Sequence, residues 1–322
     1  MIFISFFLTL CLLLTGCEEK TVRPEGITVV SFNAQTLFDD IDDGDEFSPF
    51  RRYEGWNSRK YSARLSTLRN VVTDSLDADI IFFQEIESEK VLEDLLDSKL
   101  RRRGYLYYCV ADINNPISVG FISKYKPISV SVHSIGTQRF ILRCEFMIDS
   151  CQIVFYNLHA KSNLGDDADN RNARRELAAL VNSLISSDSV VNTVVLGDFN
   201  CEPGSSLDDM LCFEGYYTAD DIISSRCIPV VRDRTRASSS VLYDVAADPA
   251  QVINAEGTYF FEGQFYDYDR FLLNAKACSS FGQTEFEIET GICFNGHYPY
   301  VYDPEAEEGF SDHFPVRLTL LR

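Results

Sequence analysis

The sequence has far fewer basic residues than acidic ones. Its 322 residues include 29 lysines and arginines against 49 aspartates and glutamates, a formal net charge of −20. Because affinity for a phosphate backbone usually depends on lysine and arginine, this balance excludes nonspecific coating of nucleic acid. If the substrate is anionic, bound cations must offset the repulsion.

Three further features are missing. There is no internal repeat or low-complexity tract, no CxxC pair of the kind that holds zinc, and no break in composition that marks a linker. With 45% hydrophobic and 13% aromatic residues, the chain is too apolar for a disordered protein. The sequence therefore predicts one globular domain, which we place at residues 27–322.

The N-terminus carries an uncharged apolar run, MIFISFFLTLCLLLTGC, which suits a signal peptide and is short for a membrane span. Its end, LTGC, resembles a bacterial lipobox, in which cleavage before the cysteine leaves a thiol that is lipid-modified. The resemblance implies a signal peptide at 1–16, a lipid anchor at Cys17 and a tether at 17–26. We expect an exported lipoprotein anchored to a membrane of the cell envelope, with a plain secreted or uncleaved, anchored protein as the alternative.

Eight of the ten cysteines lie beyond Cys17. An even number permits disulfides in an exported protein, but the sequence does not choose among the many pairings. One local pairing, Cys144 with Cys151, is predicted because RCEFMIDSCQI reads as strand, turn and strand. The alternative is that several of these cysteines are buried thiols.

Four apolar segments with the composition of strands end in polar residues. The ends are Asn33, Glu85, His159 and, in VVLGDFNC, the pair Asp198 and Asn200. The period of two in a strand puts that pair on one face, where the strand leaves the core. Any one such residue is more often part of a turn. Because α/β folds collect catalytic groups at strand ends on one rim of a sheet, four together indicate a site.

Helical patterns separate these strands. Apolar residues recur at the spacing of one helical face over 58–78 and 170–187, and 89–104 reads as one further helix closed by Gly104. Short strands follow one another over 117–160. This order predicts two β-sheets packed face to face with helices outside.

Two more motifs, YDRFLL with Asp269 and SDH at 311–313, complete the set. With SFNAQTLF, FFQE, NLHAKS and GDFN, they occur in the order of the endonuclease/exonuclease/phosphatase superfamily, which the chain resembles from about residue 29 to 316. Its members include DNase I-like nucleases, neutral sphingomyelinases and inositol-polyphosphate 5-phosphatases. The resemblance implies a four-layered α/β/β/α sandwich that hydrolyses phosphoric esters with the help of a divalent metal.

The resemblance also implies which residues hold the metal and the phosphate. Glu85 would be the principal metal ligand, with Asn33 and Asp312 nearby, and the ion would be Mg²⁺ or Mn²⁺. His159 would contact the scissile phosphate and assist the leaving group, and Lys161 would add a positive charge.

The remaining catalytic roles fall to four residues. Asp269 would orient the His313 imidazole, which acts either as general base or as electrophile toward the phosphate. Asp198 would orient or deprotonate the attacking water, and Asn200 would hold that water or a phosphate oxygen.

The segment 37–61 resembles an acidic insertion found in bacterial members of the family. A calcium loop is the alternative, because Asp39, Asp43 and Asp45 crowd together, but the ligand order of an EF-hand is missing.

The complete motif set, with GDFNCEP, favours a monomeric nuclease that acts on DNA or RNA outside the cytoplasm. A phospholipid or inositol phosphoesterase, a hydrolase of small phosphate esters, and a surface lipoprotein without catalysis are the alternatives. Neither the extended apolar hairpin of secreted sphingomyelinases nor the PAWCDR-type motif of 5-phosphatases is evident, and no catalytic residue is missing.

Overall fold

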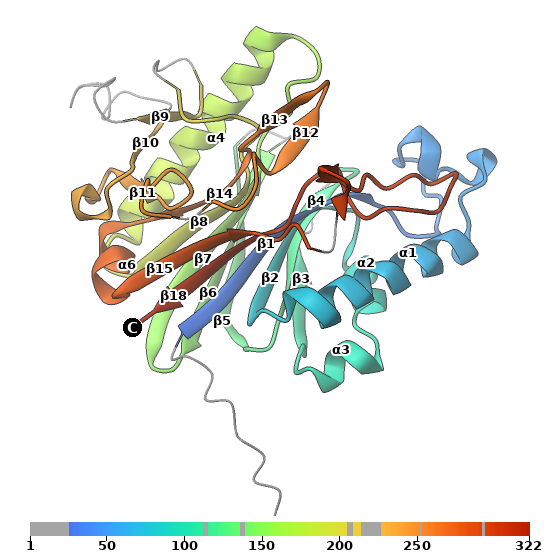
Figure 1. The fold of residues 1–322 in the computed structure, drawn as a ribbon, viewed down its shortest axis with the longest axis horizontal. Coiled ribbons are helices and arrows are strands. Elements are labelled where there is room, and N and C mark those ends of the chain that lie inside the picture. The colour runs from blue at the N-terminus through green and yellow to red at the C-terminus, as the bar shows by residue number, and fades with distance from the viewer. Residues whose placement is uncertain are drawn as a thin grey trace, which may run out of the picture.

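The strands build two β-sheets (Figure 1). This computed structural model describes residues 26–111, 115–135, 139–204, 209–213, 227–251, 253–291 and 294–322. The first sheet has the order β15-β18-β1-β2-β4-β3, and the second has the order β5-β6-β7-β8-β14-β11-β10-β9. The predicted signal peptide and the predicted anchor at Cys17 lie outside the described residues.

The strands of the first sheet are β1 (Gly26–Leu37), β2 (Ile80–Ile86), β3 (Tyr107–Val110), β4 (Ser118–Ser123), β15 (Gln283–Ile288) and β18 (Val316–Leu321). Those of the second are β5 (Pro127–Ile135), β6 (Arg139–Ile148), β7 (Cys151–His159), β8 (Asn192–Asp198), β9 (Leu211–Phe213), β10 (Ile228–Val231), β11 (Leu242–Asp244) and β14 (Asp269–Leu273). Two small hairpins pair β12 (Tyr259–Phe261) with β13 (Gln264–Tyr266), and β16 (Phe294–Asn295) with β17 (Tyr298–Pro299).

The helices are α1 (Ser58–Val71), continued by a π-helical turn (Val72–Leu76), α2 (Glu89–Leu95), α3 (Ser98–Arg102), α4 (Asp167–Ser187) and α6 (Ala275–Ser280). Short 3-10 turns occur at Ser48–Phe50, Arg52–Glu54 and Arg234–Arg236. None of the helices in the described ranges is long and apolar enough to cross a membrane.

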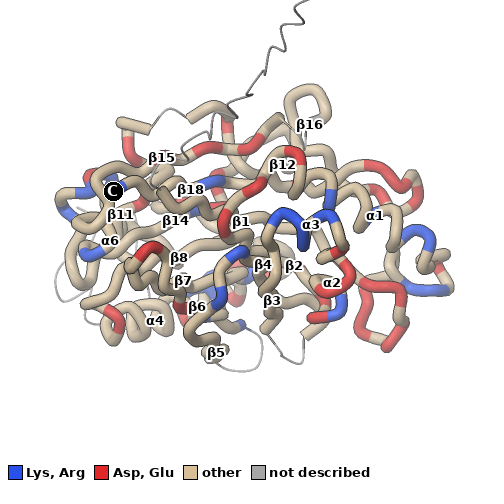
Figure 2. Tube along the Cα trace, turned by 90° about the horizontal axis from the view of Figure 1, so that it is seen from below, with Lys and Arg blue, Asp and Glu red and all other residues tan. Residues whose placement is uncertain are grey.

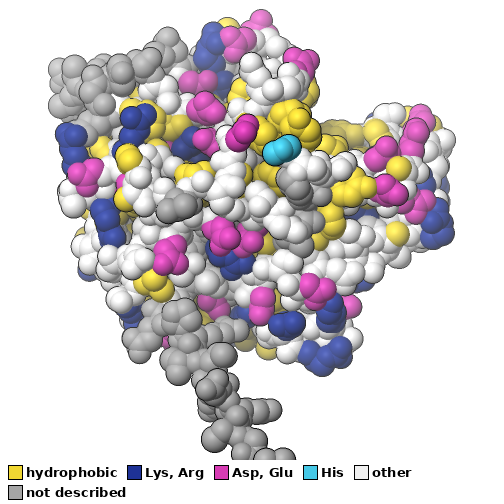
Figure 3. Space-filling model, in the orientation of Figure 1, with side chains coloured by type: hydrophobic (Ala, Val, Ile, Leu, Met, Phe, Trp, Pro, Cys, Tyr) yellow, Lys and Arg dark blue, Asp and Glu magenta, His cyan; other side chains and the backbone are white. Residues whose placement is uncertain are grey.

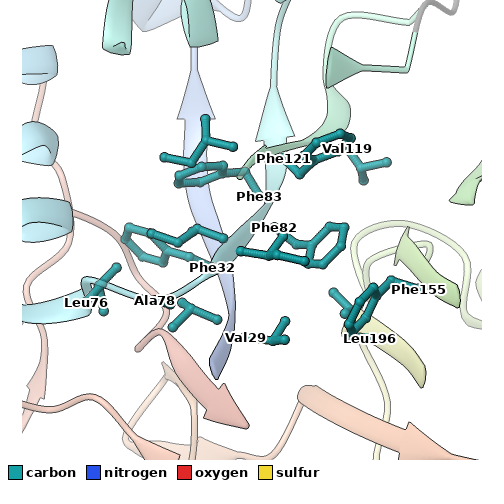
Figure 4. Packing of buried hydrophobic residues seen from close by; sticks show 14 of the residues in the cluster. Val29, Phe32, Leu76, Ala78, Phe82, Phe83, Val119, Phe121, Phe155 and Leu196 are labelled. Atoms are coloured by element: carbon teal, nitrogen blue, oxygen red, sulfur yellow. The ribbon is translucent and has the colours of Figure 1, made fainter. Parts of the chain in front are cut away.

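The main core fills the space between the sheets. Phe82 of β2 packs against Phe155 of β7 with ring centroids 5.3 Å apart, so aromatic side chains join the two sheets (Figure 4). Along β8, Val194 and Leu196 belong to this core, whereas Val195, between them, packs into a second cluster with α4. The strand period of two thus gives β8 two buried faces.

Helices cover the outer faces of both sheets. Leu65 and Leu68 of α1 join the core on the side of the first sheet, and Leu177 and Val181 of α4 pack on the second sheet. Figure 1 shows α1, α2 and α3 on one side of the molecule and α4 on the other. The predicted α/β/β/α sandwich is confirmed.

The prediction of one helix over 89–104 is wrong, because the structure divides it into α2 and α3. Leu96 leaves the helical region with ψ 68, and the Asp97 side chain then accepts hydrogen bonds from the backbone N–H groups of Lys99 and Leu100. An aspartate in that position caps a new helix, which the apolar spacing alone did not reveal.

The predicted pairing of Cys144 with Cys151 is also wrong. Strand, turn and strand form as expected, but the register sets Cys144 opposite Phe155 and Cys151 opposite Ile148. The two cysteines are therefore offset by four residues, about 13 Å along the strands, too far for a disulfide. Both are free thiols, whereas Cys212 and Cys227 form a disulfide.

Buried amides tie the two sheets together near the ends of β2 and β7. Gln84 of β2 donates from Nε2 to Asn157 Oδ1 of β7 at 2.7 Å. Asn157 in turn donates from Nδ2 to the carbonyl oxygens of Phe83 and Gly120 on the first sheet. Because a buried amide left without partners is costly, this network fixes how the sheets are placed against each other.

Parallel pairing gathers the polar strand ends. β1 runs parallel to β2, with Asn33 opposite Gln84, and β7 runs parallel to β8, with His159 opposite Asp198. The carboxyl ends of parallel strands meet at one edge of a sheet. The fold therefore brings the predicted site residues of both sheets to a common edge.

Gly197 is required where β8 passes β7. Its φ is +129°, and a Cβ atom there would lie 2.0 Å from the backbone oxygen of Leu158. We expect Gly197→Ala to lower the free energy of unfolding by at least about 3 kcal/mol, since the overlap is with backbone and φ is positive. Urea unfolding measures this loss of unfolding free energy. Gly291→Ala is the control, because a Cβ atom added there would have no other atom within 4 Å. An equal loss in both variants would contradict this account.

Candidate active site

An amide from the first sheet links the partly buried carboxylate of Glu85 to the buried carboxylate of Asp198. Asn33 donates from Nδ2 to Glu85 Oε1 at 3.1 Å and to Asp198 Oδ2 at 3.0 Å. Its Oδ1 accepts from the backbone N–H of Gln35 at 2.9 Å. Asn33 therefore bridges Glu85 on the first sheet and Asp198 on the second, two residues that lie far apart in the sequence.

Two histidines face the same carboxylates. His159 Nε2 lies 3.7 Å from Glu85 Oε1 and 3.7 Å from Asp198 Oδ2, and His313 Nε2 lies 3.7 Å from the same Asp198 oxygen. These separations are too long for direct hydrogen bonds, and a water or phosphate oxygen that touches two of the groups at once would lie beside the line that joins them. Four reactive side chains thus converge on one small space.

His313 is held from behind by Asp269. The imidazole Nδ1 lies 2.7 Å from Asp269 Oδ2, and Asp269 is fully buried at the start of β14. This contact directs Nε2 of His313 toward Asp198. The predicted His–Asp pair is present.

Charges and burial perturb the carboxylates of the site. Burial, reinforced by the negative charge of Asp312, raises the pKa of Glu85. Burial also raises the pKa of Asp198 to about 7, although the positive charge of His313 opposes this. A space that holds several buried carboxylates favours the binding of a cation.

The two histidines are shifted in opposite directions. Burial, with the positive charge of Arg139, lowers the pKa of His159 well below its ordinary value, so the ring is neutral. Burial acts in the same direction on His313, but the charges of Asp269 and Asp198 outweigh it and raise its pKa to about 10. The site therefore pairs one neutral imidazole with one imidazolium.

Backbone strain is concentrated here. Glu85 and Asn200 have φ values of 61° and 50°, and the neighbouring Gln35 and Thr36 are also left-handed. The Thr36 N–H donates to Glu85 Oε2 at 2.7 Å, and the buried guanidinium of Arg64 donates to carbonyl oxygens of this turn. Each such residue costs about 1–3 kcal/mol, a cost that folds accept mainly where function fixes the geometry.

Asn200 and Lys161 stand beside the centre. Asn200 donates from its backbone N–H to Asp198 Oδ1 at 2.8 Å and from Nδ2 to the carbonyl of Ala160 at 3.1 Å. The Lys161 ammonium lies against the carbonyl of Leu164 at 3.1 Å, so its hydrogen bonds are within its own loop. The structure thus brings together all the predicted catalytic and metal residues, with Lys161 at the rim.

Arg139 is a candidate site residue that the sequence did not single out. It is the first residue of β6, and Nη1 reaches the carbonyl of His159 at 3.5 Å, while Nε is buried without a partner among the described residues. Burial lowers its pKa, and the charges of Asp198 and Glu85 oppose that shift. No family motif includes this position, so only the folded chain reveals it.

Tyr259 and Ser311 also support the site. The Tyr259 ring stacks on His313 with centroids 4.5 Å apart. Ser311 donates from Oγ to the carbonyl of Asn33 at 2.7 Å and accepts from the backbone N–H of His313 at 3.1 Å. The serine of the SDH motif was a signal for this role, because a small hydroxyl can join two strands that carry site residues.

Arg270, the residue after Asp269, is structural. It is buried and forms an ion pair with the buried Asp244, with Nη1 2.7 Å from Oδ2. This position therefore stabilises the second sheet rather than contacting a substrate.

The acidic insertion forms a separate carboxylate cluster. Asp43, Glu46 and Glu87 bring one carboxylate oxygen each within 4.8 Å of one another. Two of the three residues named in the calcium alternative, Asp39 and Asp45, are not part of the group. Glu46 is buried, and its carboxylate already accepts from the backbone N–H groups of Asp43 and Gly44.

Comparison with solved structures shows the same architecture in proteins with several activities. Truncated TDP2 from Caenorhabditis elegans is 15% identical, with a TM-score of 0.58 over 92% of this chain and 98% of that one. TDP2 from D. rerio complexed with single strand DNA product is 12% identical, with a TM-score of 0.57 over 92% and 99%. A mannosyl-6-phosphatase from Bacteroides thetaiotaomicron is 16% identical, with a TM-score of 0.55 over 92% and 100%.

These likenesses establish the fold, since the identities are low. No curated protein matches the chain by sequence. The model of the Endonuclease/Exonuclease/phosphatase family matches residues 28–218, which hold the first four of the six predicted motifs. With this match and the shared fold, the chain belongs to the endonuclease/exonuclease/phosphatase family and is a phosphoric ester hydrolase.

Proposed function

We propose that this protein is a magnesium- or manganese-dependent phosphodiesterase that hydrolyses DNA or RNA outside the cytoplasm. The observation that carries the reaction is the convergence of Glu85, Asp198, His159 and His313 on one space between the two sheets. Hydrolysis of a phosphodiester needs an oriented water, a route for its proton and compensation of the phosphate charge. The residues around that space can supply each of these.

The metal site fits a hard divalent cation. Glu85 and Asp312 provide carboxylate oxygens, and their mutual repulsion in a buried setting is what a cation relieves. The amide of Asn33 lies directly against Glu85 and orients that carboxylate by donating to it from Nδ2. When bound, the ion supplies positive charge next to the phosphate.

His313 is placed to donate a hydrogen bond to the phosphate. Asp269 accepts from Nδ1, which orients the ring and stabilises its charged form, and Nε2 points into the central space. Of the two roles left open by the sequence, this arrangement favours the electrophile over the general base.

Asp198 and His159 are placed to orient the attacking water and to accept its proton. Asp198 Oδ1 is fixed by the Asn200 backbone and Oδ2 by Asn33, so the carboxylate has one orientation. A water between Asp198 Oδ2 and His159 Nε2 is within reach of both acceptors. We assign Asp198 as the group that orients and deprotonates it.

Three observations support nucleic acid as substrate. The family includes a relative that is bound to single strand DNA product. Arg139 adds a buried positive charge beside the site. The hairpin β12–β13 has strands of three residues each and a turn at Glu262 and Gly263, unlike an extended apolar hairpin that enters a lipid surface. Figure 2 shows lysine and arginine positions distributed over several elements and interspersed with aspartate and glutamate positions.

The place of action rests on the sequence. The apolar N-terminal run and Cys17 support export and lipid anchoring, and a monomer suffices because the described residues of one chain complete the site.

The first prediction concerns activity on nucleic acid. Residues 18–322 should degrade end-labelled linear oligonucleotides in magnesium or manganese and not in chelator. Asp198→Asn and His313→Ala should each slow degradation at least about a hundredfold, because each removes a group that acts on the water or the phosphate. Gel electrophoresis of labelled products measures it.

Parallel assays separate the alternatives. Hydrolysis of sphingomyelin vesicles or of a hexose 6-phosphate, with nucleic acid untouched, would reject the nuclease. A folded protein that binds metal and hydrolyses none of these substrates would favour the non-catalytic lipoprotein.

The second prediction concerns the metal. Glu85→Gln should raise the magnesium concentration at half-saturation about tenfold or more, because a charged oxygen ligand is lost. Calorimetric titration measures this without turnover. Glu87→Gln, which alters the separate acidic cluster, is the control and should leave the titration unchanged. If Glu87→Gln weakened magnesium binding and Glu85→Gln did not, the metal would be assigned to the cluster of Asp43, Glu46 and Glu87 instead.

The third prediction concerns Arg139. Arg139→Met should lower kcat/KM for bis(p-nitrophenyl) phosphate about a hundredfold, and Arg139→Lys should recover part of the loss, because the guanidinium is expected to contact a phosphate oxygen. Steady-state kinetics measure it. Arg102→Met, an exposed arginine of α3, is the matched control. Unchanged kinetics in Arg139→Met would remove this residue from the site.

A further inference from the structure

A cavity of about 560 Å³ adjoins the site at Asp312. The residues used below, which together we call the acidic-aromatic cavity, are Phe260, Asn295, Tyr298, Asp303, Glu308 and Asp312. They come from the β12–β13 hairpin, the β16–β17 hairpin and the loop that leads to the SDH motif. Because Asp312 borders both, a group attached to a phosphate in the active site would be within reach of this cavity.

One wall of the cavity is aromatic. Phe260 packs against Tyr298 with ring centroids 4.0 Å apart, and Phe265 of β13 supports Phe260 from 4.9 Å. Tyr298 is nevertheless 45% exposed, so part of its ring is free to meet a ligand. Figure 3 shows hydrophobic side chains, with tyrosine in the same colour, gathered along a hollow of the surface near β12. A flat ring can stack on such a wall.

The other wall is acidic. Asp303 accepts from the backbone N–H groups of Glu305 and Ala306, which hold its pKa below the ordinary value, and Glu308 accepts from the hydroxyl of Tyr300 at 2.7 Å. With Asp312 they make three carboxylates, and no lysine or arginine lines the cavity in the described part of the chain.

These walls select what can lie beside the scissile phosphate. A further phosphate in the cavity would face the carboxylates of Asp303 and Glu308, with no lysine or arginine in the described lining, and such a juxtaposition of like charges is unfavourable. An uncharged ring that carries hydroxyl and amino groups fits better, since it can donate to Asp303 and Glu308 and stack on Tyr298. The Asn295 amide can pair with the edge of a base.

We propose that the acidic-aromatic cavity binds the terminal nucleoside of a nucleic-acid strand, so that the enzyme removes nucleotides from a chain end and leaves a hydroxyl on the shortened strand. The proposal rests on the nuclease function and deepens it. In each turnover one water adds to phosphorus, one P–O bond breaks and its oxygen takes up a proton. The rest of the strand, with its phosphates, leaves on the side of Arg139 and Lys161, the cations that line none of the cavity.

The test compares three single-stranded DNAs of one sequence: linear with hydroxyl ends, linear with a phosphate on both ends, and circular. The strand with hydroxyl ends should be shortened from an end, and the other two should be attacked at least about tenfold more slowly, because each presents a phosphate to the cavity. Equal rates on all three strands would overturn the inference and leave the nuclease function standing.

Charge variants probe the cavity itself. Asp303→Asn/Glu308→Gln keeps both acceptors of internal hydrogen bonds and removes two charges, so the preference for hydroxyl ends should fall about tenfold. Asp149→Asn/Glu285→Gln makes the same change in charge at exposed positions outside the cavity and should keep the preference. An unchanged preference in the first variant would overturn the inference. Hydrolysis of bis(p-nitrophenyl) phosphate with no attack on any strand would reject the nuclease function, and this inference with it.

Discussion

The contact between Gln84 and Asn157 is the constraint on which the site depends. Glu85 belongs to the first sheet and Asp198 to the second, and apolar packing between sheets allows small sliding movements that would separate them. The amide pair, buried at 2.7 Å and bonded onward to the carbonyls of Phe83 and Gly120, has one satisfied arrangement. Gln84 immediately precedes Glu85, and Asn157 lies two residues before His159. The hydrogen bond between them therefore fixes the relative position of the two sheets next to the site.

Several residues with unfavourable backbone conformations lie at the same edge of the sheets. Glu85 and Asn200 adopt left-handed conformations, which cost more for the glutamate than for the asparagine, and Gly197 passes so close to β7 that no Cβ fits. These features turn the carboxylate of Glu85 and the amide of Asn200 away from the regular alternation of a strand. Regular strands would present their residues above and below the sheet. The strained ends direct them into the space between the two sheets, which is where a phosphate can be surrounded.

Much of this arrangement could be predicted from the sequence, because hydrophobic periodicity marks the long strands and α1 and α4, and polar residues at strand ends mark the edge. What could not be predicted depends on local capping or on distant contacts. Asp97 starts a new helix through its side chain, and Cys144 is separated from Cys151 by strand register rather than by sequence distance. The contact of Arg139 with the carbonyl of His159 places it beside the site, and no linear pattern in the sequence predicts that contact.

The direction of β1 has a consequence for an enzyme held at a surface. The strand begins at Gly26, immediately after the tether, and Asn33 lies seven residues further on, about 23 Å along the strand. If Cys17 is the anchor, as proposed, the tether joins β1 at the end of the strand opposite the catalytic edge. The domain would then present its catalytic edge to the surrounding fluid and meet molecules that arrive by diffusion. A lipid of the same membrane would reach the site only if the whole domain turned over on its tether.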